Sequence, residues 1–364
     1  MTDPQPDPQP TTTGFPPPEP APHKPNRFLF GRFGFRAGYG IAIYAAVFVV
    51  LQIIGGLIAV AANGQLKEAI ALRMQAAAHP GSPAPHLTLR FTPTLVFTLD
   101  TIVFAGLFLL CWILHRAERR PLANFGLAAR RAADLIPGSL WGFTALSIVV
   151  AILAATHHLI FDGRALYGLP AFGYGIAWLF AFLAVGFCEE YSVRGYIQYT
   201  LMRGVWGWAE RLMPSDPFRA AFWIAATITS LFFGLMHTTN KGENVLGIIM
   251  VVLFAMMSCY ALWRTGSLWW SIGFHALWDW AQSFLFGVAD SGNVSVGRLF
   301  VTHPAGKPWL SGGADGPEGS IVAFFVLLLF FAVIRFTTTP GEHPSPERAL
   351  APLSPPQEPT PAIA

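Results

Sequence analysis

Charged residues are scarce in this sequence. Only 12% of its 364 residues are Asp, Glu, Lys or Arg, whereas 53% are hydrophobic, and the mean hydropathy is +0.48. Soluble globular domains carry about 25% charged residues, so the composition favours a membrane protein. The net charge is only +3, and the Lys and Arg residues do not gather along one face as nucleic-acid binding requires. Nucleic acid is therefore excluded as a partner class.

Cysteine is also scarce, and secretion signals are lacking. Cys111, Cys188 and Cys259 lie in apolar runs without C-x-x-C spacing, which excludes a disulfide framework and a thiolate metal site and predicts small buried side chains. The Pro-rich beginning has no apolar core of a signal peptide. We expect disordered Pro-rich tails at residues 1–36 and 337–364.

Long apolar runs are abundant. A spanning helix needs about 20 mostly apolar residues, and the sequence predicts an all-α polytopic membrane protein of about eight transmembrane helices with a buried polar active site. The expected spans are Ala37–Ala62, Phe91–Leu114, Leu135–His157, Ala171–Met202, Ala220–His237, Val245–Trp263, Leu268–Gly287 and Ser320–Phe336. Residues 288–319 would form an extramembrane loop before the last span.

The distribution of positive charge predicts the orientation of these spans. With eight spans, sixteen of the 23 Lys and Arg residues fall on the side that holds both termini, and seven fall on the other side. Positive residues in short loops are retained in the cytoplasm. We therefore expect an integral membrane protein, in contact with the lipid bilayer, with both termini cytoplasmic.

Three ionisable residues interrupt the fourth span. Each would cost about 2.5–3.5 kcal/mol at the centre of a lipid-facing helix, so such residues usually face a protein interior or a watery cavity and mark function. Glu190 and Arg194 are four residues apart and can pair along the helix. Glu189 points about 100° away from Glu190 and is left without a local partner. We interpret Glu190 and Arg194 as a supporting pair and Glu189 as a chemical group.

Two histidines occur in later spans at helical spacings. Phe233 lies one turn before His237, and Asp279 lies one turn after His275. Each motif alone is weak, because a single histidine near a helix end is often an interfacial or core residue. A carboxylate one turn from an imidazole can, however, fix its tautomer and orientation.

Together these groups indicate a site that activates water. In one interpretation Glu189, His237 and His275 bind Zn²⁺ with a position left open for water. In the other, no metal is needed: Glu189 is the general base and the histidines stabilise the oxyanion. The residues do not choose between the two interpretations.

The depth of the fourth span is a second open question. If the embedded part is Trp178–Met202, the glutamates lie near mid-depth, and if it is Ala171–Glu190, they lie at the cytoplasmic edge. His237 ends the fifth span toward the outer face. A site shared by Glu189 and His237 therefore requires the deeper placement together with a tilted fifth helix, or other bounds for the fifth span.

The motifs Glu-Glu-x-x-x-Arg, Phe-x-x-x-His and His-x-x-x-Asp, in this order on successive apolar helices, resemble the CAAX protease and bacteriocin-processing (CPBP or Abi) family of intramembrane proteases. The resemblance covers roughly Ala171 to Leu285. It implies a catalytic core at residues 171–287, with Glu189 activating water and His237 assisting. His275 would hold the oxyanion or position the substrate. Asp279 stands where prenyl-protein proteases have Asn, and because an ionised Asp cannot donate a hydrogen bond, it is expected to orient His275.

The resemblance implies hydrolysis of a peptide bond in or near the membrane, in a protein or peptide substrate, and fits a bacterial inner-membrane protein with residues 37–170 as its first helices. Two alternatives remain. Glu189, Glu190, Arg194 and Asp279 could form a proton or ion relay in a transporter, although the internal repeats of many transporters are lacking. The protein could also be a catalytically silent scaffold or immunity protein.

Overall fold

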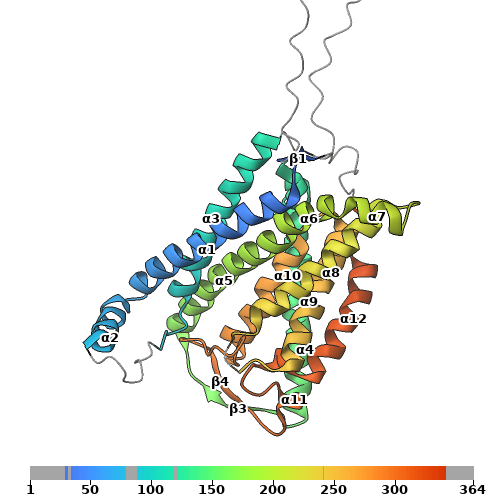
Figure 1. Ribbon diagram of the computed structural model, residues 1–364. Coiled ribbons are helices and arrows are strands. Elements are labelled where there is room, and N and C mark those ends of the chain that lie inside the picture. Colours follow the sequence, from blue (N-terminus) through green and yellow to red (C-terminus); the bar gives the residue numbers. More distant parts are fainter. Residues whose placement is uncertain (1–28, 32–33, 79–87, 119–121, 241, 342–364) are drawn as a thin grey trace, which may run out of the picture.

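A computed structural model describes residues 29–31, 34–78, 88–118, 122–240 and 242–341. Nearly all of the predicted tails lies outside these residues. Within the described parts, the backbone is mainly helical (Figure 1). The predicted all-α polytopic membrane fold is therefore confirmed.

Six helical segments are long and apolar enough to cross a membrane. They contain α1 (Ala37–Ala62), α3 (Pro93–Glu118), α4 (Leu135–Ala155), α5 (Gly168–Glu190), α8 (Pro217–His237) and α9 (Val245–Thr265). The other two expected spans correspond to shorter helices: α10 (Trp269–Trp280), extended by the π-helix η4 (Ala281–Leu285), and α12 (Ile321–Thr337). Six spans are thus supported by length and composition, and the count of eight is not confirmed.

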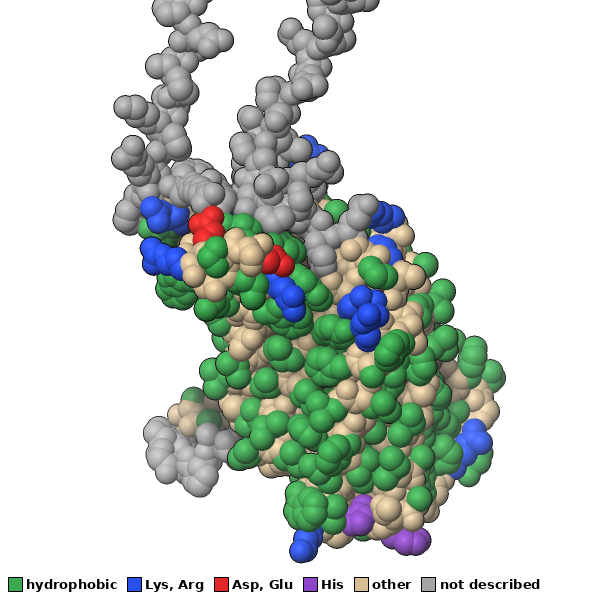
Figure 2. Space-filling view, turned by 90° about the vertical axis from the view of Figure 1, so that its right-hand side faces the viewer, with side chains coloured by type: hydrophobic (Ala, Val, Ile, Leu, Met, Phe, Trp, Pro, Cys, Tyr) green, Lys and Arg blue, Asp and Glu red, His purple; other side chains and the backbone are tan. Residues whose placement is uncertain are grey.

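The surface of the helices is that of a membrane protein. On the face shown in Figure 2, hydrophobic side chains cover the middle of the molecule, and most charged side chains lie toward its two ends. In α1, Ile53 and Leu57 are 60% and 61% exposed. A soluble protein rarely exposes contiguous apolar patches of this kind, whereas lipid contact explains them.

Short elements connect the long helices. The first described strands, β1 (Phe30–Gly31) and β2 (Gly34–Phe35), pair at the same end of the molecule as the end of α12, which we call the terminal end (Figure 1). The opposite end, called the loop end, holds α2 (Leu66–Ala78), α11 (Pro308–Ser311) and the strands β3 (Leu159–Arg164) and β4 (Phe300–Pro304). The remaining short elements are η1 (Leu122–Phe125), η2 (Ala129–Asp134), the π-helix η3 (Tyr191–Ile197), α6 (Gln198–Gly204), α7 (Trp206–Leu212) and η5 (Pro317–Gly319).

Strands β3 and β4 were not expected from the sequence. They pair antiparallel, with Leu159 opposite Pro304 and Arg164 opposite Phe300. This pairing ties the connection after α4 to the predicted extramembrane loop at residues 288–319. The loop therefore has a fixed course over the loop end of the helices.

Helix α10 is held between α4 and α5 by close backbone contact. A Cβ added at Gly142 of α4 would collide with the carbonyl oxygen of Phe274, and a Cβ at Gly186 of α5 would lie 2.9 Å from the carbonyl oxygen of Ile272. Small residues allow membrane helices to approach in this way. The contacts fix the position of His275, the next residue after Phe274.

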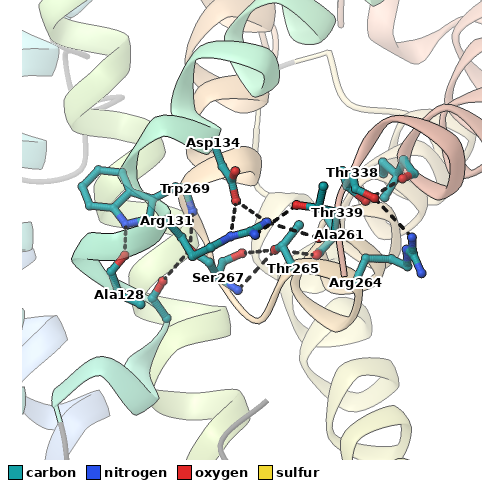
Figure 3. A network of polar contacts seen from close by, with 12 residues as sticks. Ala128, Arg131, Asp134, Ala261, Arg264, Thr265, Ser267, Trp269, Thr338 and Thr339 are labelled. Atoms are coloured by element: carbon teal, nitrogen blue, oxygen red, sulfur yellow. Dashed lines mark hydrogen bonds and ion pairs between the residues drawn. The ribbon is translucent and has the colours of Figure 1, made fainter. Parts of the chain in front are cut away.

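A polar network at the terminal end fixes the start of α10 and the end of α12 (Figure 3). Arg131 of η2 donates to the Asp134 carboxylate at 2.7 Å and to the Thr339 hydroxyl at 3.1 Å. Arg264 donates to the carbonyl oxygen of Thr338, and the Trp269 indole N–H donates to that of Ala128. Both helices are thereby fastened to the segment that precedes α4.

Candidate active site

The two adjacent glutamates end α5 and face different surroundings. The Glu190 side chain is fully buried, whereas the Glu189 side chain is 34% exposed and lines a cavity. The chain continues from Glu190 into the π-helix η3 and then into α6. Single π-helical turns within helices are often found at functional sites. The sequence did not predict this irregular turn.

Glu190 has two cationic or polar partners. Its Oε1 lies 2.7 Å from Nη1 of Arg194, the ion pair that the spacing predicts, and 3.0 Å from Nδ1 of His275. The Arg194 guanidinium also lies over the Phe233 ring, 4.9 Å from its centroid, where a cation–π interaction stabilises it. These contacts join α5, η3, α8 and α10, with Phe233 as a supporting residue.

His275 is surrounded by three carboxylates. Its Nδ1 faces Glu190, and its Nε2 lies 3.4 Å from Oδ2 of Asp279 and 3.7 Å from Oε2 of Glu189. The carboxylate at Nδ1 favours a proton on that nitrogen, as in other oriented histidines. Nε2 is then the ring atom directed toward Glu189. We expected Asp279 to orient His275, and the contact with Glu190 was not predicted.

His237 ends α8 and is also oriented. Its Nδ1 lies 2.8 Å from the carbonyl oxygen of Phe233, and the centroids of the imidazole and phenyl rings are 4.6 Å apart. With a proton on Nδ1 for this hydrogen bond, the neutral imidazole keeps Nε2 as an acceptor. The Phe-x-x-x-His spacing therefore has a direct structural meaning, because the i, i+4 geometry of the helix supplies the contact.

One cavity of about 670 Å³ joins these groups. Its wall includes the four predicted side chains Glu189, His237, His275 and Asp279, which come from three different helices. The helix that carries Glu189 runs from Gly168 to Gly204, and the cavity reaches both it and the end of α8. The cavity therefore joins Glu189 to His237, the arrangement that a shared site requires.

Asp100 of α3 is a further acidic residue of this cavity. It accepts a hydrogen bond from the Cys188 thiol and interacts electrostatically with Glu189 and His275. Its sequence signal was available, since it is an ionisable residue within an apolar span. It was missed because no second motif residue lies at helical spacing from it.

Cys188 and the other two cysteines are buried and free, as predicted. The zinc interpretation is not supported. In the described parts of the chain, no group of three or more His, Cys, Asp or Glu side chains is arranged to hold a metal ion. Although Glu189, His237 and His275 line one cavity, their geometry does not fit a set of metal ligands.

The fold and the cavity define a polytopic membrane protein with a buried carboxylate–histidine site. Residues 171–281 match the family model described as Type II CAAX prenyl endopeptidase, Rce1-like. The matched segment is less than a third of the chain but contains Glu189, Glu190, Arg194, His237 and His275 together with Asp279. Comparisons with curated proteins and with solved structures gave no match.

The family match agrees with the resemblance found in the sequence. The matched model describes endopeptidases, and the helices of the structure agree with an integral membrane protein. The matched segment includes α5, α8, α9 and α10, which form part of the cavity wall. It leaves the individual roles of the cavity residues to be argued from their geometry.

Proposed function

We propose that this protein is an intramembrane endopeptidase that hydrolyses a peptide bond with water activated by Glu189. One observation carries the proposal: Glu189, His237 and His275 line the same cavity although they lie on three helices. Glu189 is the member of the glutamate pair that is exposed to the cavity. Its carboxylate is therefore available to a water molecule, whereas Glu190 is engaged by Arg194 and His275.

The contacts support a division of tasks. Glu189 takes a proton from water, and the water oxygen attacks the carbonyl carbon of the scissile bond. When both ring nitrogens of His275 are protonated, Nδ1 holds Glu190 and Nε2–H is directed to the oxyanion of the tetrahedral intermediate. His237, with Nε2 as an acceptor, assists in passing the proton to the leaving amine. Glu190, Arg194, Phe233 and Asp279 are positioning residues in this scheme.

The test is hydrolysis by the full-length protein in lipid nanodiscs. Two internally quenched peptides serve as probes, one ending in a farnesylated CAAX sequence and one identical but without the lipid. Glu189→Gln should reduce cleavage by about 10²–10⁴-fold, the usual contribution of a general base. Glu68→Gln, which changes an exposed glutamate of α2, should retain full activity. Undiminished cleavage by Glu189→Gln would contradict the proposal.

A proton relay is the second candidate, because further acidic side chains continue from Asp279 along the cavity to Asp290 and Glu318. Proton flux into liposomes separates the two functions. A relay predicts flux that Asp279→Asn reduces, in the absence of any peptide cleavage. The endopeptidase predicts cleavage without flux.

A further inference from the structure

The loop end of the cavity is acidic. Three acidic residues line it: Asp279 near the end of α10, Asp290 after η4 and Glu318 in η5. Among its described lining residues there is no lysine or arginine. Asp290 is 9% exposed and accepts a hydrogen bond from the Ser283 hydroxyl, and Glu318 accepts one from the Ser291 backbone N–H. These two carboxylates thus accept hydrogen bonds from neutral donors, and the described cavity wall holds no Lys or Arg beside them.

Two more carboxylates lie directly behind this wall. Asp315 is 1% exposed, and its carboxyl group shares a hydrogen bond with that of Glu243. A Cβ added at Gly247, which lines the cavity, would collide with both side chains. Two carboxyl groups this close do not both ionise, so the pair shares a proton and places further acidic side chains behind the wall.

The pKa values of the acidic groups agree with this geometry. Burial raises the pKa of Asp290 above its usual range, and burial together with the carboxylates of Asp290 and Asp315 raises the pKa of Glu318. Burial and neighbouring carboxylates thus disfavour the ionised forms of these groups. A cation that enters the cavity would stabilise their ionised forms.

The arrangement selects an organic cation over a metal ion. In the described residues, no three of these carboxylates are placed around a common point as metal ligands. The same cavity continues along an apolar wall from α1 and α3, which includes Val49, Leu95 and Val96. Its two ends therefore suit a ligand with an apolar part and a positively charged part.

We infer that the loop end of the cavity binds a positively charged group of the substrate, a lysine or arginine side chain or an amine, beside Asp290 and Glu318. The inference rests on the proposed function, since it names the substrate class of that site. A free carboxylate beside Asp290 and Glu318 would meet like charge, which costs affinity and gives specificity. Substrates with basic residues next to an apolar segment should be preferred.

Three non-cleavable amphiphiles test the inference by binding alone. Dodecylammonium, dodecanol and dodecanesulfonate have the same chain and differ in charge. Each is titrated by calorimetry into nanodiscs that contain the full-length protein, with empty nanodiscs as the blank. The ammonium should bind about tenfold more tightly than the alcohol, as one charge-assisted contact predicts, and the sulfonate more weakly than the alcohol.

Variants locate the effect. Asp290→Asn combined with Glu318→Gln should remove the preference for the ammonium and leave the affinity for the alcohol unchanged, which also shows that the cavity is intact. Asp162→Asn is the matched control, because Asp162 is an acidic residue of the loop end that is 41% exposed and paired with His303. It should keep the full preference. If the double variant loses alcohol binding, the two single variants are compared, and each should reduce the preference in part.

Equal binding of ammonium and alcohol to the wild-type protein would overturn the inference, as would a preference that survives both substitutions. No bond is broken in these titrations. The result is therefore independent of the cleavage measured with Glu189→Gln, which decides the proposed function. A protein that cleaves peptides but shows no preference for the ammonium would refute the cation site alone.

Discussion

Replacing one member of the Glu190–Arg194 pair should be more harmful than replacing both. The two side chains are 0% and 1% exposed, and their charged atoms are 2.7 Å apart. Removing one partner of such a pair leaves a buried charge and costs about 3–5 kcal/mol, whereas replacing both by neutral groups of similar size is often nearly neutral. We expect Arg194→Met and Glu190→Gln each to destabilise the protein by this amount. The double variant should be more stable than either.

The assay is a double-mutant cycle. The free energy of unfolding is measured by SDS titration in mixed micelles for the wild type, both single variants and the double variant. Asp134→Asn breaks the partly exposed Arg131–Asp134 pair, in which the side chains are 19% and 22% exposed, and should cost only about 0–1 kcal/mol. If the two buried substitutions add without coupling, the ion pair does not stabilise the site and the reasoning is refuted.

Activity should not follow stability in this cycle. The double variant removes the carboxylate that holds Nδ1 of His275, so hydrolysis should stay about 10–100-fold below wild type, as when the partner of an oriented histidine is lost. Recovery of both stability and full activity would show that Glu190 supports the fold and does not position His275.

Two other perturbations give separate results. Gly142→Leu forces α4 away from the backbone of α10 and should lower the free energy of unfolding in SDS titration by about 1–3 kcal/mol. Burial and the Glu243 carboxylate raise the pKa of Asp315 to about 8, so the folded state keeps a proton that the unfolded chain loses, and stability falls as pH rises from about 4 through 8. Asp315→Asn should therefore lose less thermal stability than the wild type between pH 5 and pH 9, and parallel losses would contradict this account.

Hydrophobic runs and helical spacings were enough to predict the six long membrane helices and four side chains of the cavity, those of Glu189, His237, His275 and Asp279. A run of some 20 apolar residues has few other stable structures in a membrane, so the spans were easily found. The i, i+4 spacings placed Glu190 next to Arg194 and Phe233 next to His237, because each pair lies within a single continuous helical segment. The order of the motifs along the chain, which resembles that of a protease family, indicated that these residues belong to one site.

Contacts between distant parts of the chain could not be predicted in this way. The hydrogen bond from His275 to Glu190 joins residues 85 positions apart, and no local spacing reports it. Asp290 and Glu318 lie in a loop without a recognisable motif, and its course depends on the pairing of β3 with β4, which lies between them in the sequence, and on hydrogen bonds from Ser283 and Ser291. The close packing of α4 against α10 had a signal, since Gly138 and Gly142 are four residues apart, but its partner helix was not evident.

The π-helical turn Tyr191–Ile197 changes how the chain responds to a change of length at this point. A π-turn holds one residue more than an α-turn, so a one-residue deletion inside η3 can be absorbed when the turn relaxes to an α-helix, and the buried residues Gln198 and Arg203 that follow stay nearly in phase. The same deletion in the regular α-helix of α5 would rotate everything after it by about 100°. Among natural variants of this sequence, one-residue deletions should therefore be found in η3 more often than in α5.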